Sequence, residues 1–105
     1  IKSDRVWVVK FFSPMCGSCQ EFLPIWERLK SSVDSVEFGE VNIDNKSGMS
    51  LAQKYGALDE GIPNVKVFSR KNSDLPATVF KGTGMPNVSK LTKSIKAAIK
   101  GSQKG

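Results

Sequence analysis

A nearly continuous apolar run at residues 6–12 is followed, only a few residues later, by a stretch with helical periodicity. The run is rich in β-branched and aromatic side chains, and its length suits a central strand covered on both faces. After Ser13-Pro14, one apolar stripe recurs at helical spacing from Cys19 to about Val33; it comprises Phe22, Leu23, Trp26, Leu29 and Val33. This part of the chain therefore predicts a buried strand that leads through a short turn into an amphipathic helix.

The remaining segments complete a βαβαββα pattern. We expect a strand at about 36–43, a helix at about 49–55 that Gly56 ends, strands at 62–68 and 77–81, and a final helix that begins after the cap Asn87 and ends at Gly101. This order predicts one α/β domain over residues 1–100, with a central mixed sheet and helices on both faces. Residues 101–105 are expected to be a flexible tail or linker.

The composition excludes several kinds of chemistry. Among its 105 residues the chain has two cysteines and no histidine, which rules out a Ser/His/Asp triad, a Cys/His pair and an imidazole metal site. Two thiols cannot fill a tetrahedral zinc site alone, so we expect neither a metal nor a cofactor. No apolar run approaches the roughly 18 residues of a membrane span, and the first five residues do not have the pattern of a signal peptide. We therefore expect a soluble domain with no membrane partner.

The net charge of +6 is concentrated in the second half of the chain. Residues 54–105 hold ten basic and three acidic side chains, against six and seven in residues 1–53. Four lysines would lie on the outer side of the last predicted helix: Lys90, Lys93, Lys96 and Lys100. We interpret them as a solvated helix face and expect no nucleic-acid partner, because the chain has no aromatic RNA-binding cluster and no arginine-rich run. The alternative is a basic binding module, which would require an affinity that falls steeply with salt.

The two cysteines form the motif Cys16-Gly17-Ser18-Cys19 at the junction of the predicted strand and helix. If Cys16 lies at the helix N-terminus, unpaired backbone N–H groups and the helix dipole favour its thiolate, which is the reactive form. Cys16 would then be the attacking nucleophile and Cys19 the resolving thiol. Two alternatives remain open, namely an inert disulfide that clips the helix end and one half of an intermolecular zinc site.

The segment from Val9 to Cys19, followed by Pro24, resembles the active-site segment of the thioredoxin superfamily. Val41-Asn42-Ile43-Asp44, residues 51–56 and Gly61-Ile62-Pro63 are similar to the next landmarks of that family and follow in the same order. The resemblance covers roughly residues 6–100. Phe11-Phe12-Ser13-Pro14 is more similar to protein disulfide isomerase domains than to bacterial thioredoxins.

The resemblance implies a thioredoxin fold and thiol-disulfide exchange with the cysteines of protein substrates. It favours an oxidoreductase or isomerase domain of the endoplasmic reticulum or secretory pathway, as one part of a multidomain protein. The triplets at Asn45 and Asn87 are compatible with glycosylation there. The alternatives are a cytosolic reductase of the thioredoxin type and a peptide-binding module of the same fold whose cysteines are inert.

The resemblance also implies where a substrate would bind. The Ile62-Pro63 peptide bond is expected to be cis and to face the cysteines, with the backbone of Ile62 pairing with an extended substrate chain. The positions that match substrate-contacting residues of the family are Met15, Gly17, Ser18, Ile62, Pro63, Lys81, Gly82 and Thr83.

Several residues depart from the family pattern. Met15 stands where tryptophan is usual, and Ser18 replaces the histidine or proline of the typical motif. Asp59-Glu60 lengthens the loop before Pro63. The usual first strand and helix, before Val6, have no counterpart, which fits a trimmed domain or a shortened variant.

The sharpest departure is Lys10, which stands where the family carries a buried acid that relays the proton of the resolving cysteine. We expect an inward-facing Lys10 to have a lowered pKa through desolvation and to favour the Cys19 thiolate. A stabilised reduced form would make the disulfide a stronger oxidant. The alternative is that Lys10 extends to the surface and has no chemical role.

Overall fold

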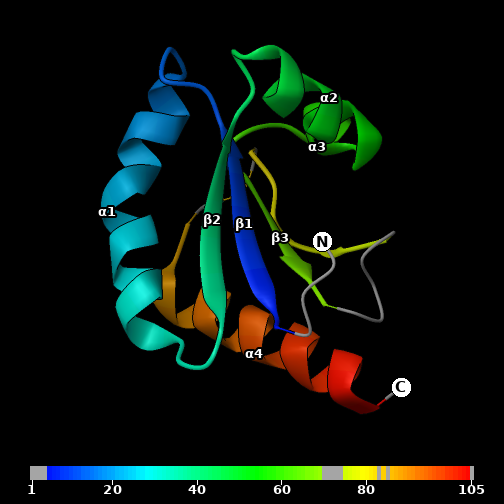
Figure 1. Cartoon of the computed structure of the whole chain (residues 1–105). Coiled ribbons are helices and arrows are strands. Elements are labelled where there is room, and N and C mark those ends of the chain that lie inside the picture. The colour runs from blue at the N-terminus through cyan, green and yellow to red at the C-terminus, as the bar shows by residue number, and fades with distance from the viewer. Residues whose placement is uncertain (1–4, 70–74, 83, 85, 105) are drawn as a thin grey trace.

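The computed structural model describes residues 5–69, 75–82, 84 and 86–104, and this part of the chain forms four strands and four helices (Figure 1). In chain order they are β1 (Trp7–Phe12), α1 (Gly17–Ser32), β2 (Glu37–Asn42), α2 (Lys46–Lys54), α3 (Ala57–Glu60), β3 (Asn64–Phe68), β4 (Ala77–Phe80) and α4 (Val88–Lys104). The alternation predicted from the sequence is confirmed, with the short helix α3 as an addition.

The four strands form one mixed sheet in the order β2-β1-β3-β4. β1 pairs in parallel with β2 and antiparallel with β3, which in turn pairs antiparallel with β4. Because β1 and β2 are parallel, their carboxyl ends lie at the same edge of the sheet, where the N–H of Ile43 donates to the carbonyl oxygen of Phe12 at 2.9 Å. The loops that follow these two strands are therefore neighbours.

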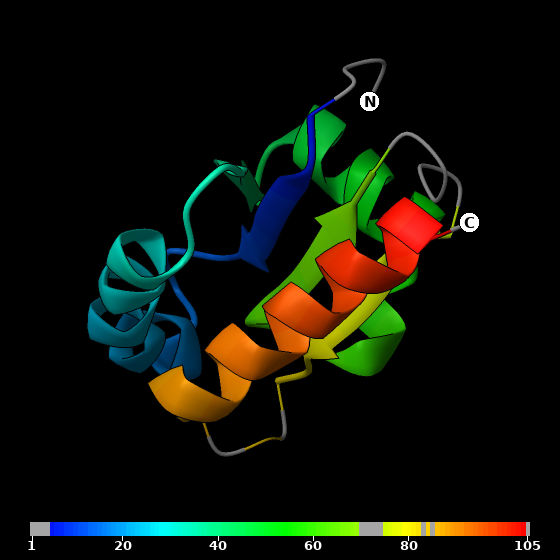
Figure 2. The same cartoon turned by 90° about the horizontal axis from the view of Figure 1, so that it is seen from below.

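Helices α1 and α4 cover one face of the sheet, as Figure 2 shows for α4. The core on this side combines strand, α1 and α4 residues: Val8, Phe22, Trp26, Leu29, Val33, Val65, Val67, Phe80, Leu91 and Ile95. The aromatic rings of Phe22 and Phe80 stack with their centroids 5.0 Å apart, which joins α1 to the edge strand β4. Within the described residues, no helix combines the length and the hydropathy needed to cross a bilayer.

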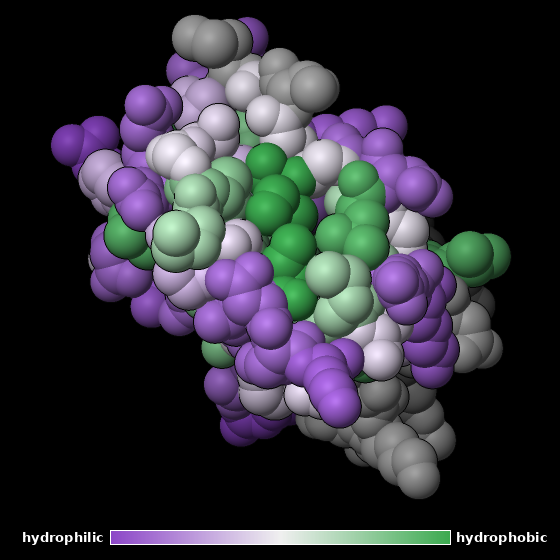
Figure 3. Space-filling view, turned by 90° about the horizontal axis from the view of Figure 1, so that it is seen from above, coloured by the Kyte–Doolittle hydropathy of each residue, from purple (hydrophilic) through white to green (hydrophobic). Residues whose placement is uncertain are grey.

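Helices α2 and α3 lie on the opposite face, around a smaller core formed by Val9, Phe11, Ile43, Ala52, Ala57 and Phe68. This face is covered only in part, and its centre is hydrophobic with hydrophilic side chains around it (Figure 3). A cavity of about 190 Å³ lies there, lined by residues that include Val41, Leu51 and Tyr55. The predicted arrangement, a mixed sheet with helices on both faces, is thus confirmed, with unequal coverage of the two faces.

Two helix boundaries differ from the predictions. Helix α2 begins at Lys46 rather than Met49, because the Asn45 side chain caps it by accepting from the N–H of Gly48 at 2.7 Å. Helix α4 continues through Gly101 to Lys104, so the expected helix end at Gly101 is wrong. Glycine lowers helix stability by only about 1 kcal/mol relative to alanine, and no proline follows to stop the helix.

Candidate active site

The two cysteines lie where β1 turns into α1. Cys16 is the N-cap residue of α1, and its Sγ accepts a hydrogen bond from the N–H of Cys19 at 3.1 Å. The N–H of Cys16 donates to the carbonyl oxygen of Ser13 at 3.1 Å, which closes the turn. Both residues are free thiols, Cys16 partly exposed and Cys19 only 3% exposed. The turn therefore presents one sulfur to solvent and keeps the second behind it.

The side chain of Ser13 anchors this turn, a role that the sequence pattern did not reveal. Its hydroxyl donates to the Asp44 carboxylate at 3.0 and 3.1 Å and accepts from the N–H of Met15 at 3.1 Å. Ser13 and Asp44 lie one and two residues beyond the carboxyl ends of the parallel strands β1 and β2, so the available signal was that both polar residues closely follow neighbouring strands. Ser13 thus fixes the backbone just before Cys16 to the neighbouring loop.

The environment of Cys19 keeps its thiol protonated. Burial raises the pKa of Cys19 to about 11, and the Cys16 side chain, through a hydrogen bond and its charge, acts in the same direction. The Ser13 backbone and the positive charge of Lys10 lower the pKa, but they do not outweigh the other influences. Two of the influences that raise the pKa depend on a free Cys16, so they disappear when the sulfur of Cys16 is bound to another sulfur.

Lys10 is buried beneath α1, so the alternative in which it extends to the surface is wrong. It is 1% exposed, and its Nζ lies 3.0 Å from Oε1 of Glu40, the residue opposite it on β2. The ammonium also lies 4.8 Å from the ring centroid of Phe12 and 5.2 Å from that of Trp26. Glu40 is partly exposed, so this ion pair connects the interior near Cys19 with the surface.

A groove beside the cysteines brings together segments that are far apart in the sequence. Its volume is about 370 Å³, and it is lined by Ser18, Glu21, Phe22, Ile25, Pro63, Phe80, Gly82, Gly84 and Pro86. The Ile62-Pro63 peptide bond is cis. Gly82 packs against this loop so closely that a Cβ on it would lie 2.4 Å from the carbonyl oxygen of Ile62. Pro63, Ser18 and Gly82 therefore share one groove.

Four of the other predicted substrate-contacting residues do not line this groove, namely Met15, Gly17, Ile62 and Lys81. Met15 is 86% exposed, and Gly17 and Lys81 are also exposed. Ile62 is partly buried, next to Gly82. The predicted contact residue Thr83 lies outside the described residues. An apolar side chain as exposed as Met15 is accessible to a partner, and its contact with a substrate stays a prediction.

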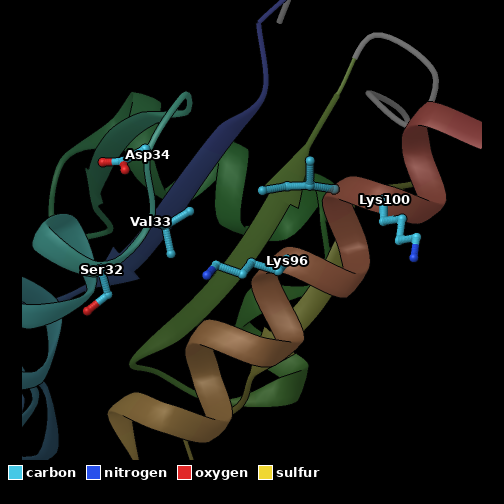
Figure 4. A pocket seen from close by; sticks show the side chains of 6 residues that line it. Ser32, Val33, Asp34, Lys96 and Lys100 are labelled. Carbon is cyan, nitrogen blue, oxygen red and sulfur yellow. The ribbon is translucent and has the colours of Figure 1, made fainter.

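The lysine face of α4 lies away from the cysteines. Lys90, Lys93, Lys96 and Lys100 are all exposed. Lys96 and Lys100 line a cavity of about 350 Å³ between α4 and the end of α1, together with Asp34 (Figure 4). The two lysine side chains extend in different directions and do not converge on one point. This arrangement fits a solvated helix face.

The cysteine pair at the start of a helix that packs on a mixed β-sheet has the geometry of a redox-type CxxC site. The thioredoxin family model matches residues 1–97 of the chain. The chain belongs to the thioredoxin family. Among solved structures it is similar to thioredoxin from Malassezia sympodialis, with a TM-score of 0.67 and 25% identity over 92% of this chain and 80% of that one. Fasciola hepatica thioredoxin, at 24% identity, has a TM-score of 0.64 and matches 92% of this chain and 84% of its own. The thioredoxin fold is thereby confirmed.

Relatives among characterised proteins include protein disulfide isomerases. Human protein disulfide-isomerase A6 is 39% identical over 74 residues, which are 69% of this chain and 16% of that protein. Protein disulfide-isomerase erp38 of Neurospora crassa is 28% identical over 109 residues, covering 100% of this chain and 28% of that protein. The chain therefore corresponds to a minor part of each relative's length, and these relatives support a thiol-disulfide oxidoreductase at the level of the family.

Proposed function

We propose that this domain exchanges disulfides with the cysteines of protein substrates, as an oxidoreductase or isomerase domain of the endoplasmic reticulum type. The observation that carries the proposal is the pairing of a partly exposed Cys16 at a helix N-terminus with a buried Cys19 beside it. Backbone N–H groups at a helix start stabilise negative charge, and a thiolate is the attacking form of cysteine. The relatives named as protein disulfide isomerases support the choice of substrate and compartment.

In the reductive direction the Cys16 thiolate attacks one sulfur of a substrate disulfide. A new bond forms between Cys16 and that sulfur, the substrate disulfide breaks, and its other sulfur leaves as a thiolate. Cys19 then loses its proton and attacks the sulfur of Cys16, which releases the second substrate thiolate and leaves a Cys16-Cys19 disulfide. Two electrons pass from the dithiol to the substrate, and the reverse sequence oxidises a substrate dithiol.

The two cysteines would act in sequence because of how their environments are coupled. With Cys16 free, the pKa of Cys19 is raised by burial and by Cys16 itself, so Cys19 stays protonated. In the mixed disulfide, Cys16 carries no charge and its hydrogen bond with the Cys19 side chain is lost. The pKa of Cys19 then falls at the step that requires its thiolate, which favours resolution over premature attack.

The groove supplies the place for the substrate chain. We infer that an extended peptide lies along Pro63 and Gly82 and pairs with the backbone of Ile62, which leaves its disulfide next to Cys16. The apolar lining residues Phe22, Ile25 and Phe80 would receive apolar side chains with little sequence selectivity. Met15, exposed beside Cys16, offers a flexible apolar contact.

Reduction of insulin disulfides in the presence of dithiothreitol tests the proposal. Cys16→Ser should abolish the acceleration over dithiothreitol alone, and Cys19→Ser should accumulate a mixed disulfide with the substrate. Ser31→Ala, a small change on the exposed face of α1 far from the cysteines, is the control and should keep full activity. Acceleration that survives Cys16→Ser would reject the enzyme assignment and leave a peptide-binding module. The redox potential of the pair and the refolding of scrambled ribonuclease then separate reductase from isomerase.

A further inference from the structure

A second buried lysine, Lys66, lies on the opposite face of the sheet from Lys10. It is 2% exposed on β3, and its Nζ lies 2.5 Å from Oε1 of Glu60 and 2.6 Å from the hydroxyl oxygen of Thr78. A buried ammonium group is strongly unfavourable unless an opposite charge and hydrogen bonds compensate it. Lys66 is not part of the cysteine chemistry, so its pairing with Glu60 requires another explanation.

The Glu60 carboxylate accepts hydrogen bonds from three residues of two strands. Besides Lys66, the Asn64 side chain donates to Oε1 at 3.1 Å, and the Thr78 hydroxyl lies 3.2 Å from each carboxylate oxygen. Burial opposes ionisation of Glu60, but these hydrogen bonds outweigh it, so the pKa of Glu60 lies below its usual value. The carboxylate therefore stays charged and fastened to β3 and β4 at neutral pH.

This anchored residue is the last one of α3 and stands immediately before the loop that carries the cis bond. A helix of four residues cannot hold its position through its own hydrogen bonds. Gly61 follows with a φ of +96°, a backbone conformation that suits glycine, and then come Ile62 and Pro63. The side chain of Glu60 thus attaches the start of this loop, at the end of α3, to strands β3 and β4.

The other side of the same loop is fixed by Gly82. Its N–H donates to the carbonyl oxygen of Gly61 at 3.2 Å, and the absence of a side chain lets it pack against Ile62. The loop is therefore held from both sides, by a buried charge pair and by a close backbone contact. Pro63, at its end, lines the groove beside Ser18.

We propose that Glu60 is a positioning residue for peptide substrates. Its carboxylate, held by Lys66, keeps the backbone of Ile62 in the orientation that an extended substrate chain needs for pairing. Glu60 belongs to the Asp59-Glu60 pair, which was expected to lengthen the loop before Pro63 and lies instead in helix α3. Among the described residues, Glu60 forms no hydrogen bond or ion pair with either cysteine. This inference rests on the proposed exchange activity and assigns the last residue of α3 to substrate binding rather than to the chemistry.

The test compares Glu60→Gln with Asp59→Asn, the same kind of change at the exposed neighbouring residue. The rate of reduction of a disulfide-containing peptide is measured over a range of peptide concentrations, and hydroxyethyl disulfide serves as a small substrate that does not use the groove. We expect Glu60→Gln to raise KM for the peptide about fivefold with kcat unchanged, because it weakens binding and not the chemical step. The reaction with hydroxyethyl disulfide should stay unchanged in both variants, and Asp59→Asn should resemble the wild type.

An unchanged KM in Glu60→Gln overturns the proposal, and so does an equal increase in Asp59→Asn. If Glu60→Gln does not fold, Thr78→Val removes one hydrogen bond to the same carboxylate and should raise KM by a smaller factor; no increase would again reject the inference. A wild type that reduces neither substrate contradicts the exchange activity instead. In that case amide exchange at Gly61 and Gly82 decides whether Glu60 holds the loop: faster exchange in Glu60→Gln supports the anchor, and unchanged exchange rejects it.

Discussion

Replacing Lys10 by methionine should make the Cys19 thiol less acidic. Lys10 is buried on β1 beneath α1, and its positive charge is one of two influences that lower the pKa of Cys19. The uncharged methionine fills a similar volume without that charge. Its partner Glu40 has a side chain that is 43% exposed, so water can solvate the carboxylate once the ammonium is gone. We therefore expect the fold to survive and the effect to appear in the chemistry.

The magnitude follows from the acidity of Cys19. At a pKa of about 11, the thiolate at pH 7 amounts to about one molecule in ten thousand. The influence of Lys10 is the smallest of those that act on Cys19. We expect its loss to reduce the thiolate fraction by a factor of about two, with a smaller slowing of the step in which Cys19 attacks, because a thiolate of higher pKa is the better nucleophile.

Alkylation of Cys19 by iodoacetamide, measured in a Cys16→Ser background, isolates this thiol. At a fixed pH well below the pKa of Cys19, the alkylation rate is proportional to the thiolate fraction. Lys10→Met should lower this rate, whereas Lys66→Met removes a second buried lysine on the other face of the sheet and should leave it unchanged. Equal rates with and without Lys10→Met would refute the reasoning, as would an equal decrease in Lys66→Met.

Three further predictions concern the framework of the site. Gly82→Ala should destabilise the fold by about 1–3 kcal/mol, because its Cβ would collide with the carbonyl oxygen of Ile62; an unchanged urea midpoint would contradict this. Asn45→Ala should cost about 1 kcal/mol in the same measurement through loss of the α2 cap, with peptide reduction unaffected, and a loss of activity at full stability would be inconsistent with a capping role. Glu60, whose pKa is lowered in the folded state, contributes stability that is present above its ordinary pKa of 4.5 and is lost as the pH falls through the lower folded value. The difference in unfolding free energy between wild type and Glu60→Gln, measured from pH 7 to pH 3, should therefore shrink toward acid, because Lys66 then faces an uncharged partner in both; a constant difference would argue against the charge pair.

The parts of the site that depend on local pattern could be predicted from the sequence. The apolar run at 6–12 specifies a strand through its length and its β-branched and aromatic content, and the stripe that includes Phe22 and Trp26 specifies a helix through its periodicity. The position of Cys16 at the helix start follows from that junction. The residue type of Lys10 was visible as a departure, but its pairing with Glu40 depends on how β1 and β2 align, which no local pattern specifies.

The features that were missed depend on contacts between distant segments. Helix α3 has four residues and is held by the side chain of Glu60, which no helical periodicity could reveal. The early start of α2 was hidden because Gly48 resembles a turn residue. In the structure, a Cβ at this position would lie 1.9 Å from the carbonyl oxygen of Asn42, so glycine is there for a close backbone approach within a helix.

The position of Cys16 as the cap of α1 links the redox state of the protein to the first turn of one of the two helices that cover this face of the sheet. A sulfur that accepts the N–H of Cys19 is a better acceptor as a thiolate than as a half of a disulfide. In the Cys16-Cys19 disulfide a covalent bond joins the N-cap to the third residue of the helix, so the first turn of α1 is constrained by the S–S bond in place of this hydrogen bond. Because such coupling is reciprocal, a substitution that loosens this turn changes the dithiol–disulfide equilibrium without contacting either sulfur.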